Sequence, residues 1–387
     1  MIGLEYQLVI LSVVGMMAVI ALVNLATLRS LRQEDMPGSF PKVSVLLPVR
    51  NEAAHIRTCL SRLADQHYPD FEVIVLDDNS EDLTASLAEE VAGGNQRIRV
   101  LRGKLLPSGW TGKTFACHQL SELAAGEILL FTDADTVHSS FSISAAVAAL
   151  QEQGAGLLTV IPRQMTKTFW ENTVLPMLHF VTWCYLPYPL VRFTRNPKFA
   201  MANGQFMLFR RHVYDRIGGH ASVRSALVED VWLSRRVKSF GSRLAIMDGG
   251  EAVSCRMYSD FRAIWEGFSK NLFPGFKYSV PAISAVIIFN TLTSVLPFTL
   301  ILAGLFVNSV SEPWFAAVAA QVVMVLGIRL LMAFRFRMRL WPAFLHPIAM
   351  LLMIGIAINS CRWALTGGGV RWRGRSYDFR KQIITQK

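Results

Sequence analysis

A short apolar run that ends in two carboxylates constrains the fold of this chain more than any other feature. Residues 128–132 read Ile-Leu-Leu-Phe-Thr and are followed by Asp133, Ala134 and Asp135. The run is too short to span a membrane, and a buried strand of this kind places both acids at its carboxyl end, where α/β folds bind divalent cations and phosphates. A D-x-D sequence also occurs in surface turns, so the neighbouring segments must decide between these interpretations.

Two more apolar runs upstream also stop at polar clusters. They begin at Val43 and Val73, and a helical pattern covers residues 54–66 between them. The order strand, helix, strand, helix, strand predicts an α/β fold with a mostly parallel sheet, whose ligand crevice lies beyond the carboxyl ends of the strands. Residues 77–82 alone also fit a plain turn before a helix N-cap. The candidate site residues at these two strand ends are Pro48, Arg50, Asn51, Glu52, Asp77 and Asp78.

Five motifs occur in a fixed order over residues 43–240: P-V-R-N-E, D-D-N-S-E-D-L-T, G-W-T-G-K, D-A-D and V-E-D-V. As an ordered set they resemble the inverting family 2 glycosyltransferases of the GT-A fold, a Rossmann-like sheet flanked by helices. Residues 109–113, 217–220 and 372–377 are similar to segments of the membrane-bound members that glycosylate carotenoid acids of the diaponeurosporenoate type or hopanoid-type lipids. The resemblance implies a hexosyltransferase that uses a nucleotide sugar.

The amino-terminal end of the chain has the character of a membrane anchor. Residues 8–28 form an apolar run of bilayer length without a basic segment before it or a cleavage site, which predicts a retained anchor. Arg29 and Arg32 follow the run and Glu5 precedes it, so the positive-inside rule places the large domain in the cytoplasm, at the plasma membrane. The predicted organisation is an anchor at residues 1–30, a GT-A domain at 40–278, membrane helices at 279–366 and a basic tail at 367–387.

Three further apolar stretches, at residues 280–307, 314–334 and 344–365, make the chain multi-pass. Arginines separate the last two stretches and basic residues crowd the tail, so both basic segments should be cytoplasmic. Three full crossings would put the tail outside, and one stretch is therefore expected not to span fully. The first stretch is interrupted by polar residues and Pro297, which fits a re-entrant or interfacial element.

The net charge of +11 arises from 39 basic and 28 acidic residues. Much of the basic excess flanks the apolar stretches, so attraction to anionic lipid headgroups accounts for it and no nucleic-acid partner is expected. The five cysteines form no C-x-x-C pair, which fits a reducing cytosol.

Departure of a nucleoside diphosphate requires positive charge at the leaving group. Asp133 and Asp135 are candidate ligands for Mg²⁺ or Mn²⁺, and the resemblance makes Asp135 the direct metal ligand, with Asp133 nearer the donor ribose or the metal shell. Lys113 precedes an apolar helical stretch, from which its ammonium can reach a diphosphate; a surface lysine in a loop is the alternative. Lys270 lies where membrane relatives carry Q-x-x-R-W, the motif of processive polysaccharide synthases, and is a second cationic candidate.

The resemblance assigns residues 48–52 together with Asp77 and Asp78 to the donor's base and ribose. A carboxylate can accept the imide N–H of uracil, which favours a UDP-sugar, although thymidine presents the same group.

Residues 228–231 resemble the E-D motif that supplies the catalytic base. Asp230 is the predicted base, next to Glu229, and one base suffices because the acceptor attacks the anomeric carbon directly. An acidic pair at a helix start, favoured by the helix dipole, is the structural alternative. His220, after a glycine pair, is predicted to contact substrate.

The predicted reaction moves one sugar to an apolar lipid such as a carotenoid acid or another terpenoid. The aromatic segment at residues 169–193 is a candidate to cover the active site or to guide such an acceptor out of the bilayer. An aromatic stripe is more often part of a core, but the position of this segment between the D-A-D and E-D motifs favours an acceptor role. Alternatives are transfer to a polyprenyl phosphate or diacylglycerol, synthesis of a short polysaccharide, and a nucleotide-binding membrane scaffold without activity. A scaffold has no need for both a metal site and a base.

Overall fold

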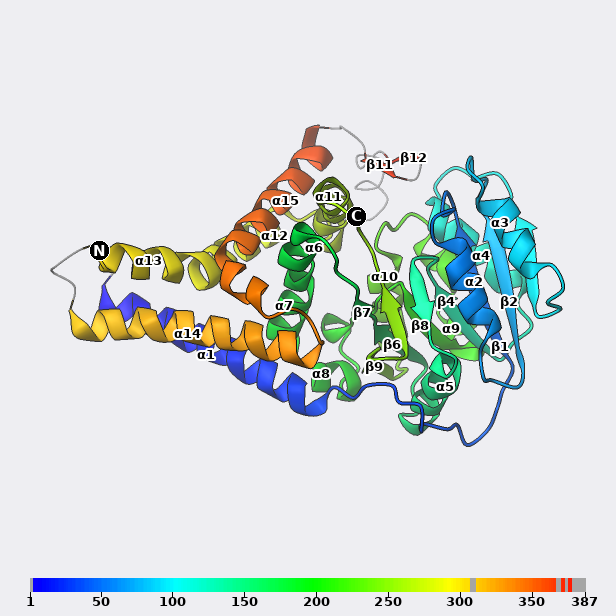
Figure 1. The fold of residues 1–387 in the computed structure, drawn as a ribbon, viewed down its shortest axis with the longest axis horizontal. Coiled ribbons are helices and arrows are strands. Elements are labelled where there is room, and N and C mark those ends of the chain that lie inside the picture. Colours follow the sequence, from blue (N-terminus) through cyan, green and yellow to red (C-terminus); the bar gives the residue numbers. More distant parts are fainter. Residues whose placement is uncertain (1–2, 307–310, 367–369, 373–374, 378–387) are drawn as a thin grey trace.

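The computed structural model describes residues 3–306, 311–366, 370–372 and 375–377. These residues form an α/β domain and a bundle of long apolar helices that extends away from it (Figure 1).

The main sheet has seven strands in the described part of the chain, in the order β3-β2-β1-β4-β8-β6-β9. Neighbours pair in parallel except at β8, which runs antiparallel to β4 and to β6. The predicted α/β fold with a mostly parallel sheet is therefore confirmed. The strands are β1 (Val43–Val49), β2 (Phe71–Asp77), β3 (Ile98–Arg102), β4 (Ile128–Thr132), β6 (Leu157–Ile161), β8 (Phe206–Arg210) and β9 (Leu244–Asp248).

Helices cover both faces of this sheet, which is why its strands are almost continuously apolar. Successive residues of β1 point to opposite faces: Leu46 packs in a core cluster with α4, and Val45 packs in another with α2 and α5. The helices of the domain are α2 (Ile56–Ala64), α3 (Thr84–Ala92), α4 (Gly112–Leu123), α5 (Ser142–Glu152), α9 (Arg211–Arg216) and α10 (Glu229–Ser239). A small second sheet has the order β5 (Thr136–His138), β10 (Val253–Cys255), β7 (Arg163–Gln164).

Four helices in the described residues are long and apolar enough to cross a membrane: α1 (Leu4–Thr27), Val280–Gly304, α14 (Glu312–Arg335) and Trp341–Thr366. The second combines α12 (Val280–Asn290), a π-helical turn (Thr291–Val295) and α13 (Leu296–Gly304); the fourth begins with η4 (Trp341–Leu345) and continues as α15 (His346–Thr366). The polar interruption noted in the sequence thus becomes a π-helical turn within one continuous helix.

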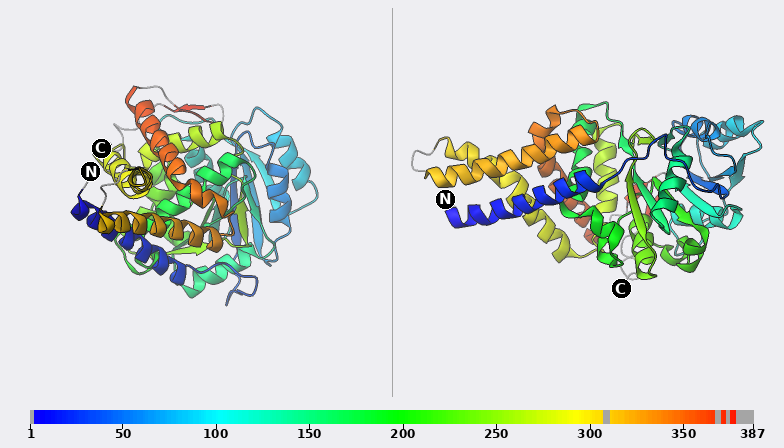
Figure 2. Two further views of the ribbon diagram at one scale, coloured as in Figure 1. Left: turned by 60° about the vertical axis from the view of Figure 1, so that its left-hand side comes forward. Right: turned by 90° about the horizontal axis from the view of Figure 1, so that it is seen from below.

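The bundle helices differ in direction. α1 and α14 lie side by side and, with α13, extend away from the α/β domain (Figures 1 and 2). Gln321 of α14 donates from Nε2 to the backbone oxygen of Gln7 at 2.9 Å and to its Oε1 at 3.1 Å. In contrast, α15 runs obliquely across α12, packs on α11 (Phe261–Gly275) and leads towards β11 (Val370–Trp372) and β12 (Arg375–Tyr377) beside the α/β domain.

The aromatic segment 169–193 joins α1 to the domain. Asn24 of α1 is fully buried; its Nδ2 donates to the carbonyls of Trp183 and Leu186, and its Oδ1 accepts from the Tyr188 N–H. The Trp183 indole donates to Ala21 O at 2.6 Å. Much of this segment is therefore core, not an open acceptor path. Its helices are α6 (Phe169–Val174), α7 (Pro176–Tyr185) and α8 (Tyr188–Phe193).

An ion pair fixes the inner ends of α1 and α14 to the sheet. Arg335 binds the carboxylate of Asp248 at the end of β9, and it also donates to Ser30 Oγ and Leu28 O. Asp248 is nearly buried and its partner is one-fifth exposed, so this contact is shielded from solvent.

Candidate active site

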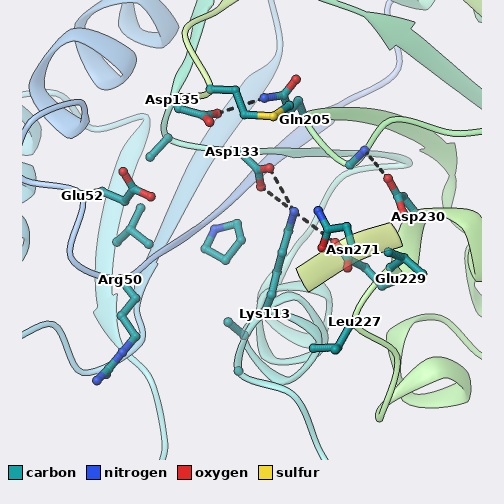
Figure 3. Close-up of a pocket in the computed structure, with 18 of the residues that line it drawn as sticks. Arg50, Glu52, Lys113, Asp133, Asp135, Gln205, Leu227, Glu229, Asp230 and Asn271 are labelled. Carbon is teal, nitrogen blue, oxygen red and sulfur yellow. Dashed lines mark hydrogen bonds and ion pairs between the residues drawn. The ribbon is translucent and has the colours of Figure 1, made fainter. Parts of the chain in front are cut away.

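A cavity of about 230 Å³ lies at the carboxyl ends of β1 and β4 and is closed by α4, α10 and α11. It brings together side chains that are far apart in the sequence (Figure 3). Ten of the predicted site residues line it: Pro48, Arg50, Glu52, Asp78, Lys113, Asp133, Asp135, Glu229, Asp230 and Lys270. Three do not: Asn51, Asp77 and His220.

The acids meet because β1, β2 and β4 are parallel neighbours and end at one edge of the sheet. Asn51 and Asp77 support the loops at this edge from behind. Asp77 accepts from the Ser80 N–H at 3.2 Å, and Asn51, with a φ of 53°, accepts from the Glu81 N–H at 2.8 Å through Oδ1. These contacts fix the loop turns on which the cavity-lining residues stand.

Lys113 links the two acidic motifs of the cavity. Its Nζ lies 2.8 Å from Asp133 Oδ1 and 3.0 Å from Glu229 Oε1. Burial alone would lower the pKa of Lys113, but the two carboxylates hold it well above its usual value. Burial likewise favours the neutral form of Glu229, yet the ammonium keeps the pKa of this carboxyl below its usual value. Lysine and glutamate are therefore both charged in this wall of the cavity.

Asp135 and Asp133 form a strongly negative corner. Burial, then the charges of Asp133 and Glu52, raise the pKa of Asp135 to about 7. A divalent cation would relieve this repulsion, so the donor set fits a metal. No group of three His, Cys, Asp or Glu in the described residues is arranged to hold a metal ion. Two carboxylates still suffice for Mg²⁺ or Mn²⁺ that is bound together with substrate phosphates and water.

Asp230 lies in the first turn of α10, on the other side of the cavity. Its Oδ2 accepts the Gly204 N–H at 2.9 Å and its Oδ1 accepts the Val231 N–H at 2.8 Å. Burial, followed by the charge of Glu229, raises the pKa of Asp230 to about 6, which suits a base that works near neutral pH. Gly204 is confined between charges, since a Cβ there would lie 3.2 Å from Lys113 Nζ.

His220 lies behind the cavity wall and not in it. The residue is fully buried, its Nδ1 is 2.8 Å from the Tyr214 hydroxyl, and its ring centroid is 4.6 Å from that of Phe131. Burial lowers the pKa of His220 to about 3, so the imidazole is neutral. Gly219 has a φ of 48°, and a Cβ there would lie 2.6 Å from the Tyr214 ring. The geometry gives the glycine pair and His220 a role in packing the core.

Several lining residues were not singled out from the sequence. Met257 and Tyr258 follow β10, and Leu227 precedes the E-D motif. Gln205 also lines the cavity, and its amide lies beside Asp135. The signal for its position is the antiparallel pairing of β8 with β4, which brings the start of one strand to the end of the other.

Residues 44–218 match the family model described as Glycosyl transferase family 2. This segment is a family 2 glycosyltransferase domain. The glycosyltransferase is 26% identical over 372 residues to the 4,4'-diaponeurosporenoate glycosyltransferase of Staphylococcus aureus strain MRSA252, a match that covers 91% of this chain and 92% of the relative. The same enzyme from strain USA300 matches with the same identity and coverage.

Among solved structures, the glycosyltransferase resembles the mannosyltransferase PcManGT from Pyrobaculum calidifontis, determined with GDP-Man and Mn²⁺. The TM-score is 0.57 at 17% identity, and the match covers 92% of this chain and 99% of the other. This likeness concerns the fold. The family model confirms the predicted family for residues 44–218, and together with the named relatives it confirms the enzyme class. The structural likeness confirms the predicted GT-A fold, and the described helices include apolar ones near both ends of the chain.

Proposed function

We propose that the glycosyltransferase moves one sugar from a nucleoside diphosphate sugar, with UDP as the favoured nucleotide, to a hydroxyl or carboxyl group of an apolar lipid. The observation that carries this proposal is that Asp133, Asp135 and Lys113 face Asp230 across one cavity. The groups that would stabilise the departing diphosphate and the base that would deprotonate the acceptor are thus within reach of one substrate. The relative that acts on diaponeurosporenoate and the apolar helices favour a carotenoid acid or another terpenoid as acceptor.

The donor half of the cavity neutralises the diphosphate. Asp135 and Asp133 would hold a divalent cation, which supplies positive charge to the departing diphosphate when bound. Lys113 and Lys270 approach the same cavity from α4 and α11 and add positive charge to it. Arg50, Glu52 and Asp78 form the side on which the base and ribose are proposed to lie.

The acceptor half removes a proton. The acceptor oxygen forms a bond to the anomeric carbon while the bond from that carbon to the diphosphate oxygen breaks, and the hydroxyl proton passes to Asp230. Attack opposite the leaving group inverts the anomeric centre, so an α-linked donor gives a β-linked product. An acceptor carboxylate has no proton to lose, and in that case Asp230 contributes less.

We also propose that the catalytic domain and the carboxyl terminus lie on the cytoplasmic side. Arg29 and Arg32 follow α1, and arginines follow α14, as the positive-inside rule requires. The oblique course of α15 supports Trp341–Thr366, rather than Val280–Gly304, as the stretch that does not cross fully. A green fluorescent protein fused after Lys387 should then fluoresce in intact cells; a dark fusion of normal abundance would place the tail outside.

The function is tested by supplying membranes that carry the full chain with labelled nucleotide sugars, defined acceptors and Mg²⁺ or Mn²⁺. We expect metal-dependent label in a carotenoid or other terpenoid band, absent in Asp135→Asn and unchanged in the exposed control Asp70→Asn. With a hydroxyl acceptor, Asp230→Asn should lower the rate about 10²- to 10⁴-fold. Label only in phospholipid or polymer would favour the alternative acceptors, and no label with any donor would favour a scaffold.

A further inference from the structure

Gln205 occupies a fixed position in the wall of the cavity. It directly precedes β8 and is 4% exposed. Its backbone N–H donates to Asn203 Oδ1 at 2.9 Å, and its carbonyl accepts from Thr132 Oγ1 at 2.8 Å. The main chain is thus held from both sides, and the side chain extends from a rigid base towards the D-A-D motif.

The side-chain amide of Gln205 is only half satisfied. Nε2 lies 3.5 Å from Asp135 Oδ1 (Figure 3). It also lies 2.7 Å from Cys255 Sγ. Oε1 is buried and has no hydrogen-bond partner among the residues that the structure describes. An unsatisfied buried acceptor costs about 1–3 kcal/mol. The amide therefore lines the carboxylate corner from a fixed backbone, with Nε2 directed towards Asp135 and Oε1 left without a partner.

We propose that Gln205 is the third protein ligand of a divalent cation, together with Asp135 and Asp133. This inference rests on the proposed function. No trio of His, Cys, Asp or Glu in the described part of the chain is arranged for a metal, and an amide oxygen supplies the missing hard ligand without adding negative charge.

The amide can serve both the metal-free and the metal-bound states. Without a cation, Nε2 faces the Asp135 carboxylate, as observed. A half-turn about the last side-chain bond exchanges the amide oxygen and nitrogen, and directs Oε1 to the same place. The Cys255 thiol then becomes a donor to Oε1, so its proximity remains favourable. Repulsion between Oε1 and Asp135 disfavours this orientation until a cation lies between them.

The test measures Mn²⁺ binding directly, by electron paramagnetic resonance of free Mn²⁺, on the full-length protein in detergent with UDP present. Gln205→Leu should raise the Kd for Mn²⁺ about 10- to 100-fold. Gln205→Glu keeps the shape and an oxygen in place, and its Kd should stay within a few-fold of wild type or fall. Gln119→Leu is the matched control. Gln119 lies on α4, is buried like Gln205, and accepts a hydrogen bond from the Lys104 N–H away from the acids.

Each outcome supports or overturns the assignment. An unchanged Kd in Gln205→Leu overturns the assignment of Gln205. If Mn²⁺ binding is lost in Asp135→Asn at the same time, the metal site of the proposed function still stands without Gln205. Equal weakening in Gln205→Leu and Gln205→Glu also overturns the assignment, because a group that merely orients Asp135 through its N–H is not restored by a carboxylate. If the wild type does not bind Mn²⁺, the metal requirement of the proposed function fails as well.

Discussion

Replacement of Lys113 by methionine should destabilise the enzyme strongly at neutral pH. The ammonium lies 2.8 Å from Asp133 and 3.0 Å from Glu229, and the three side chains are 23%, 27% and 7% exposed. Removal of one partner from a buried ion pair costs about 3–5 kcal/mol, and the partial exposure of Asp133 favours the lower end. At about 2–4 °C per kcal/mol, a loss of about 3 kcal/mol lowers the melting temperature by about 6–12 °C.

The pH dependence of this loss of stability shows whether its cause is electrostatic. In the wild type, Lys113 holds the pKa of Glu229 below its usual value, so this carboxylate contributes stability above its unfolded pKa, and the contribution is lost as the pH falls. In Lys113→Met the carboxylates are buried without their cation, and their pKa values rise above the usual range. The free-energy cost of burying these unpaired carboxylates is then present at neutral pH, and it shrinks as the carboxylates take up protons. The difference between the two proteins should therefore be largest above pH 7 and smaller at pH 5.

Thermal unfolding in detergent, followed by tryptophan fluorescence from pH 5 to pH 8, measures this difference. Lys104→Met is the matched control, since its side chain is exposed, and it should shift the melting temperature by little at any pH. Lys113→Arg keeps the charge and should recover part of the loss. A loss in Lys113→Met that is equal at all pH values would refute the electrostatic argument, because packing alone does not follow carboxyl titration.

Three further outcomes are expected. With a hydroxyl acceptor and saturating Mg²⁺ or Mn²⁺, which keeps Asp135 ionised, the initial rate should be flat above pH 6 and fall about tenfold per pH unit below it. The reason is that the pKa of Asp230 is about 6 and its carboxylate must be ionised; a pH-independent rate over pH 5–8 would exclude it as the base. Asn24→Leu leaves three backbone groups of residues 183–188 unpaired and should cost about 3 kcal/mol or more, measured by thermal unfolding, while an unchanged melting temperature would show that α1 is not held there. Arg335→Met should cost about 3 kcal/mol in the same assay because Asp248 is nearly buried, whereas the exposed Arg337→Met should cost well under 1 kcal/mol; equal effects would contradict the role of shielding.

The acidic half of the site was predictable because it depends on short-range rules. Apolar runs that end in Asp78, Asp133 and Asp135 imply strand ends, and parallel strands align those ends without further information. The position of Gln205 depends on the placement of β8 between β4 and β6, an antiparallel insertion that the order of elements along the chain does not reveal. For His220, a polar residue after two glycines suggested a substrate contact, but the decisive fact is the tertiary packing of Tyr214 against it.

The long apolar helices were predictable in length and not in arrangement. Hydropathy located each apolar stretch, because roughly 20 apolar residues suffice to cross a bilayer. Whether a stretch then crosses directly or slants is decided by its neighbours, as the packing of α15 on α11 illustrates. The core role of Trp183 likewise depends on its hydrogen bond to Ala21, a residue far away in the sequence.

The contact between Gln7 and Gln321 has a consequence for how the enzyme is made. The two residues are 314 positions apart, so at 5–20 residues per second a ribosome needs roughly 15 to 60 s to supply the partner of the first helix. If α1 and α14 cross a membrane, as their length and apolar character allow, the Gln7 amide is in the bilayer without Gln321 during that interval, and the apolar remainder of α1 alone keeps the helix inserted. Assembly of the bundle is therefore finished late, after the catalytic domain has been synthesised, when α14 becomes available to pair with α1.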